Sequence, residues 1–155
     1  MTAKQKTLDL LRAQRNAVDA PAAVERRDRW LAALEDLYEQ IHAWVGGTEE
    51  PGLIVWKRGP HHIKERYLEE YVAGQVDLVM PSGETVEFVP VGTYILGADG
   101  RVDVRGARGA AKLIWDRTVG WSNAIQNRLG AWEMEPLTEE TFWALIGGLI
   151  SAPPS

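Results

Sequence analysis

The feature that most constrains this chain is a wide apolar stripe in the segment that follows Pro21. Apolar residues recur there at spacings of four, three, four and three, the period of one helix face: Trp30, Leu34, Leu37, Ile41 and Trp44. Leu31, Tyr38 and Val45 make the stripe wider than the two-position seam of a coiled coil. We therefore expect this helix to pack on a sheet of its own chain, with Leu37 buried and one margin left for another subunit.

Capping residues indicate where the helices of the first fifty residues begin and end. Pro is tolerated at the first position of a helix, so Pro21 marks a start, and Asp19 just before it can accept unsatisfied backbone N–H groups. Gly46 and Gly47 predict the end of the helix in a left-handed conformation. A weaker helix is expected over residues 3–18, because polar side chains interrupt its apolar stripe.

The composition then shifts to Gly, Pro and Val, which is typical of strands and turns. Turn sequences lie at 81–84, 97–100 and 106–109. They separate runs that we expect to be strands, at 53–57, 76–80, 85–91, 93–96, 101–105 and 111–115. Such short connections cannot hold crossover helices, so the strands should form an antiparallel meander. In residues 63–72 the glutamates favour a helix and the aromatic and β-branched residues suit a strand; of the two we favour an extended edge element. The pattern over 117–131 predicts no structure.

A last helix is expected from Thr138, an N-cap residue followed by Glu139 and Glu140 in the first turn. Its apolar face would comprise Phe142, Leu145, Ile146 and Leu149, with Leu137 stapled onto Phe142. The expected fold is a single α+β domain over residues 1–150, in which N-terminal helices pack on an antiparallel β-meander closed by a C-terminal helix. Its parts are 1–47 (helical), 53–135 (β) and 138–150 (helix), and 151–155 form a flexible tail.

Composition excludes several classes of function. A chain of 155 residues without cysteine has no disulfides, thiolate nucleophiles or thiolate metal sites. It also shows no signal-peptide run and no membrane-spanning stretch, so we expect a cytoplasmic protein that does not bind membranes. The net charge of −5 disfavours nucleic acid. A local surplus of basic residues from Arg101 to Arg117 keeps nucleic-acid binding as an alternative.

Candidate catalytic groups lack a recognisable spacing. His61 and His62 are adjacent, so they point in different directions and suit a solvated turn beside a strand better than a metal site. The acidic residues of the β part could supply an acid–base pair, but no spacing marks two of them as partners: Glu69, Glu70, Asp77, Glu84 and Glu87. We assign no catalytic, cofactor-binding or metal-binding residue. A small enzyme with a carboxylate or histidine site in the β part remains a second alternative.

Aromatic and basic residues supply the candidate partner-binding positions. Seven tryptophans are many for this length, and such side chains dominate both cores and interface anchors. Trp30, Trp44 and Trp115 suit the core. The positions that could contact a partner are Arg105, Arg108, Trp121, Trp132 and Trp143. We therefore predict a non-enzymatic accessory or interaction protein of the inhibitor, immunity or assembly-factor type, whose partner is another protein or a second copy of itself.

Overall fold

The elements follow the predicted order of helices, sheet and helix. The computed structural model describes residues 1–18, 20–93 and 98–153. Its helices are α1 (Ala3–Ala17), α2 (Pro21–Gly46) and α3 (Glu139–Leu149). The strands between α2 and α3 are β1 (Val55–Ile63), β2 (Tyr71–Val79), β3 (Thr85–Gly92), β4 (Gly100–Gly106), β5 (Gly109–Asp116), β6 (Gly120–Gln126) and β7 (Trp132–Pro136). Each strand pairs antiparallel with its neighbour in sequence, in the order β1 to β7, which confirms the α+β meander.

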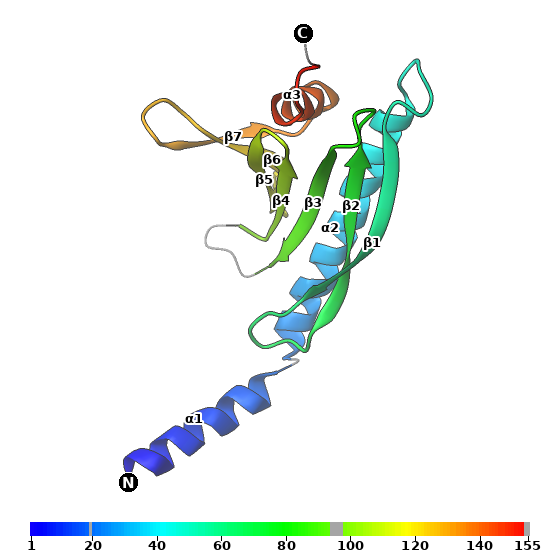
Figure 1. Cartoon of the computed structure of the whole chain (residues 1–155). Coiled ribbons are helices and arrows are strands. Elements are labelled where there is room, and N and C mark those ends of the chain that lie inside the picture. The colour runs from blue at the N-terminus through cyan, green and yellow to red at the C-terminus, as the bar shows by residue number, and fades with distance from the viewer. Residues whose placement is uncertain (19, 94–97, 154–155) are drawn as a thin grey trace.

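The helices are distributed unevenly over the two faces of the sheet. α2 runs along one face, here called the inner face, and α3 lies at one end of β4 and β5 (Figure 1). At that end Arg108 donates its backbone N–H to the carbonyl of Leu149 at 3.0 Å. The opposite face, here called the outer face, carries no helix, so the side chains of the strands themselves form its surface (Figure 1).

The core forms where the α2 stripe meets the inner face. Trp30, Leu34 and Leu37 are fully buried, as expected for a helix that packs on a sheet of its own chain. The rings of Trp44 and Phe142 lie 5.3 Å apart between their centroids. This contact joins α2 to α3. The sheet contributes alternate residues of its central strands, which is the period of a pleated surface: Val76, Leu78, Val86, Phe88, Val102, Val104 and Leu113.

The N-terminal half of α2 fits the sheet through a close approach of Trp30 to β4. A Cβ atom added at Gly100 would lie 2.2 Å from the Trp30 ring, so only glycine leaves room for the indole. The Trp30 ring also meets Trp121 of β6, at 5.9 Å between ring centroids. Trp121 also donates from Nε1 to the carbonyl of Ala33 at 3.2 Å, so β6 is tied directly to α2.

α1 has little contact with the rest of the protein. It projects from the body (Figure 1), and Leu10 and Leu11 are exposed. Thr2 caps it by accepting a hydrogen bond from the N–H of Gln5, and its weak apolar stripe fits this isolated position. None of the helices in the described residues is both long and apolar enough to cross a membrane.

Helix capping differs from the sequence prediction at both ends of α2. The N-cap is Ala20, which makes no side-chain cap, and Asp19 lies outside the described residues. Gly47 has a φ of −83°, so the predicted left-handed ending is wrong. At α3 the prediction is confirmed, since the Thr138 hydroxyl accepts from the N–H of Thr141 in a capping box.

Several strands also differ from the prediction. β1 continues through Gly59 and Pro60 to Ile63, so His61 and His62 lie in a strand and not in a turn. The expected edge element at 63–72 divides into the end of β1, a connection and the start of β2. β6 lies within the stretch 117–131, for which no structure was predicted, and β7 follows directly after it. The strand predicted at 93–96 lies outside the described residues except for Thr93. Of the turn predicted at 97–100 only the first residue lies outside them, and Gly100 already begins β4.

Replacing Gly100 with alanine tests the packing of the Trp30 ring against β4. The new methyl group would overlap a buried ring, and such overpacking costs about 1–3 kcal/mol, so we expect Gly100→Ala to lower the free energy of unfolding measured by chemical denaturation. The matched control is Gly148→Ala in α3, where no atom would meet the new Cβ. Helix propensity predicts that the control gains about 0.5–1 kcal/mol. A neutral Gly100→Ala would contradict this packing.

Candidate functional site

The outer face of β4 to β7 combines long charged side chains with very short ones. Strand register places Asp103 opposite Lys112, and Lys112 opposite Ala124. In the next row Arg105 lies opposite Ala110. Side chains at alternate positions share a face, so these residues point away from α2.

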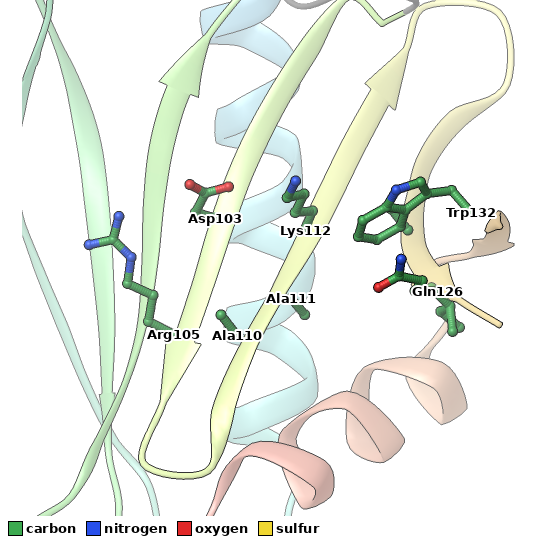
Figure 2. Close-up of a pocket in the computed structure, with 9 residues that line it drawn as sticks. Asp103, Arg105, Ala110, Ala111, Lys112, Gln126 and Trp132 are labelled. Carbon is green, nitrogen blue, oxygen red and sulfur yellow. The ribbon is translucent and has the colours of Figure 1, made fainter. Parts of the chain in front are cut away.

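This combination produces a hollow of about 400 Å³. Ala110 and Ala124 are too short to fill it, while Arg105, Lys112 and Trp132 stand around it (Figure 2). Its surface is completed by Asp103, Ala111, Ile125 and Gln126. We call it the Trp132 hollow. It is largely apolar with a cationic border, which suits a small apolar group that carries or adjoins an anion.

Trp132 forms one side of the hollow and stays exposed. Register places it opposite Gln126 at the start of β7, and 56% of its surface is accessible. The Nζ atom of Lys112 lies 5.0 Å from the centre of its ring, within the range of a cation–π interaction. This contact and the β6 pairing hold the indole at the edge of the hollow.

Trp132 is the exception among the seven tryptophans. The other six are buried or packed against the core, including Trp121 and Trp143, which were candidate anchors. Trp121 is opposite Trp115 on the inner face, and Trp143 packs edge-on against Phe142 at 5.1 Å. Trp121 and Trp143 therefore have little surface left for contact with a partner, and Trp132 is the one tryptophan among the exposed large apolar residues.

The basic residues between 101 and 117 are dispersed over the β4–β5 hairpin. Arg101 pairs with Asp103 at 3.0 Å on the outer face. Arg108 is at the β4–β5 turn, whereas Arg117 follows the opposite end of β5, a strand about 24 Å long at 3.4 Å per residue. Arg105 and Arg108 are both exposed, as expected. Arg105 borders the Trp132 hollow, but Arg108 is outside it.

The histidines and carboxylates do not converge on a site. His62 Nδ1 lies 3.9 Å from Glu70 Oε1, with both side chains exposed. Glu84 accepts the N–H of Ser151 at 3.2 Å and so fixes the chain after α3. Asp77 and Glu87 are cross-strand neighbours on the outer face. Among the described residues no group of three or more histidine or acidic side chains could hold a metal ion.

A second polar cluster joins α2 to β1. Arg58 forms an ion pair and hydrogen bonds with Glu35, and its guanidinium stands 5.2 Å from the Tyr38 ring centre. The hydrogen bond from Arg58 lowers the pKa of Glu35 and raises that of Arg58. Burial raises the pKa of Tyr38, whose hydroxyl donates to the carbonyl of Gly74 at 2.6 Å. Each group is engaged within the fold, so the cluster is structural.

A third cluster ties the β1–β2 connection to the end of β3. Glu65 accepts hydrogen bonds from the backbone and hydroxyl of Thr93 and from the Tyr71 hydroxyl. Burial, together with the hydrogen bond to Glu65, raises the pKa of Tyr71. At the β5–β6 turn, the N–H groups of Val119 and Thr118 lower the pKa of Asp116. These contacts also maintain turns and connections.

Comparison of the chain with protein-family models, with curated proteins and with solved structures found no match. Its function is therefore inferred from the geometry of its own surface.

The Glu35–Arg58 pair predicts a pH-dependent contribution to stability. A carboxylate whose pKa is lowered by folding stabilises the fold above its unfolded pKa, near 4.3, and loses that contribution as the pH falls through the folded value. Because both side chains are partly exposed, we expect Glu35→Gln to cost only about 0.2–1 kcal/mol at pH 7. Denaturation at several pH values should show this difference shrinking below about pH 4. A constant difference would contradict the assignment.

The exposure of Arg105 and Arg108 predicts that neither supports the fold. Replacing both with glutamate should change the free energy of unfolding by about 0.5 kcal/mol or less, as measured by thermal denaturation. Gly106→Ala is the contrast and should lower the free energy of unfolding, because the new Cβ atom would lie 2.6 Å from the Leu149 carbonyl oxygen. A large loss of stability in the double variant would show that these arginines are structural.

Proposed function

We propose that this chain is a non-enzymatic protein-interaction module that binds a partner protein through the Trp132 hollow. The observation that carries the proposal is the exposure of Trp132, since the other six tryptophans pack into or against the core. Exposed tryptophans beside a preformed hollow are typical of interface hot spots.

The border of the hollow indicates the chemistry of the partner. Arg105 has no ion pair among the described residues, and the Lys112 ammonium group rests over the Trp132 ring. Asp103, the carboxylate that lines the hollow, is already paired with Arg101. A partner that places an aliphatic or aromatic side chain against Ala110 and Ala124, with a carboxylate beside it, would satisfy both the apolar floor and the cationic border.

Truncating Trp132 tests this proposal. A tagged chain should retain a stoichiometric companion from a lysate of its native host, and Trp132→Ala should weaken that retention by about 30-fold, the effect of losing a hot spot of about 2 kcal/mol. Quantitative mass spectrometry of the retained proteins measures the change. Arg105→Glu should also reduce retention, because the carboxylate of the partner would then meet a like charge.

Leu129→Ala is the matched control. Leu129 lies in the same β6–β7 hairpin and is 93% exposed, but it is not part of the hollow. Its truncation should leave retention unchanged. Equal losses from both variants would indicate nonspecific adhesion of an apolar hairpin, and a companion that ignores Trp132→Ala would overturn the proposal.

A further inference from the structure

The free edge of β7 offers backbone groups beside the Trp132 hollow. The N–H of Asn127 bonds to the carbonyl of Ala131, and the N–H of Leu137 bonds to that of Trp121. Hydrogen-bonded pairs alternate along an antiparallel ladder, so Glu133 and Glu135 direct their backbone groups toward β6. The N–H and C=O groups of Trp132 and Met134 therefore point away from the sheet.

The position of proline agrees with this assignment. Pro136 has no N–H, and in the same alternation it falls at a position that faces the free edge. The β6–β7 ladder therefore loses no hydrogen bond at this residue. The edge ends there, which leaves Trp132 and Met134 as the two residues with both groups available.

The two sides of this edge differ in charge. Trp132 and Met134 are on the outer face next to the hollow, and both are more than half exposed. Glu133 and Glu135 are exposed on the inner face, where Asn127 donates to Glu133 at 3.0 Å. A strand added here would place alternate side chains against an apolar row and an acidic row.

This pattern disfavours pairing between two copies of β7. An antiparallel pair centred on Met134 would place Glu133 opposite Glu135 of the second copy, and a register in which Trp132 faces Met134 would place Glu133 opposite itself. Like charges directly opposite one another destabilise a sheet. A foreign strand with basic residues at those positions meets no such repulsion.

We infer that the partner adds a β-strand antiparallel to β7, with apolar residues beside Trp132 and Met134 and Lys or Arg opposite Glu133 and Glu135. This inference rests on the proposed function and names the binding mode of the partner. Backbone hydrogen bonds to Trp132 and Met134 hold the strand, and the alternating side chains select it. The apolar row then continues from the added strand into the Trp132 hollow.

A capped seven-residue peptide of alternating lysine and valine is the probe. It should bind the full chain in calorimetry, whereas the matching glutamate–valine peptide should not. In NMR hydrogen exchange, the exchange rates of the Trp132 and Met134 amides should fall on binding. The amides of Glu133 and Glu135, which are already hydrogen-bonded to β6, should keep the same slow exchange. Glu133→Lys combined with Glu135→Lys should reverse the preference between the peptides.

Met134→Pro separates backbone pairing from charge attraction. It removes an N–H that β6 does not use and leaves the charge unchanged, so we expect the fold to persist and peptide affinity to fall at least tenfold. Glu133→Pro is the contrast, because it removes a ladder N–H and should lower the melting temperature. Should Met134→Pro unfold, the exchange pattern and the charge reversal still decide the question.

Three results would overturn strand addition: no binding of the lysine–valine peptide, full binding to a folded Met134→Pro variant, or unchanged exchange of the Trp132 and Met134 amides. The native companion distinguishes this failure from failure of the proposed function. If retention of the companion requires Trp132 but is unaffected by Met134→Pro, the proposed interaction through the Trp132 hollow would hold and only strand addition to β7 would be refuted.

Discussion

The rest of the structure depends on the packing of the α2 stripe against one face of the sheet. Trp30 is seated over Gly100 of β4 and against Trp121 of β6, so α2 contacts the two strands on either side of β5. Because α2 and α3 pack on the same buried cluster, the large aromatic residues gather there. The outer face has no such cover, and its hollow follows from the strand side chains alone.

Local patterns predicted the helices and most of the meander, because period and turn chemistry are properties of short segments. The α2 stripe and the Thr138 cap are examples. β1 was misjudged at Gly59 and Pro60, which usually end a strand; an edge strand tolerates proline because its outer N–H groups need no ladder partner. The alternation of Trp132, Glu133, Met134 and Glu135 was the available signal for β7.

The candidate site was predictable only in part, because it depends on register across several strands. Exposure of Arg105 and Arg108 followed from a glycine-rich turn close by. By contrast, the face on which Trp121 lies is decided by its pairing with Trp115, and a shift of one residue would have reversed it. The hollow exists because Ala110 of β5 and Ala124 of β6 lie on the same face of the sheet. Their common position depends on the pairing between strands, so no short segment of sequence predicts it.

The two exposed edges of the sheet differ in a way that bears on partner choice. β1 is long, but it carries Lys57 and Arg58 and contains Pro60, and these residues discourage pairing with other chains. β7 is short and acidic on one side, but its outward backbone groups belong to the same residues that form the apolar row. Trp132 thus presents its indole to the hollow and its backbone to the edge. A partner that engaged both would be selected by side-chain shape, charge pattern and strand conformation together, which is a more demanding combination than an apolar patch alone imposes.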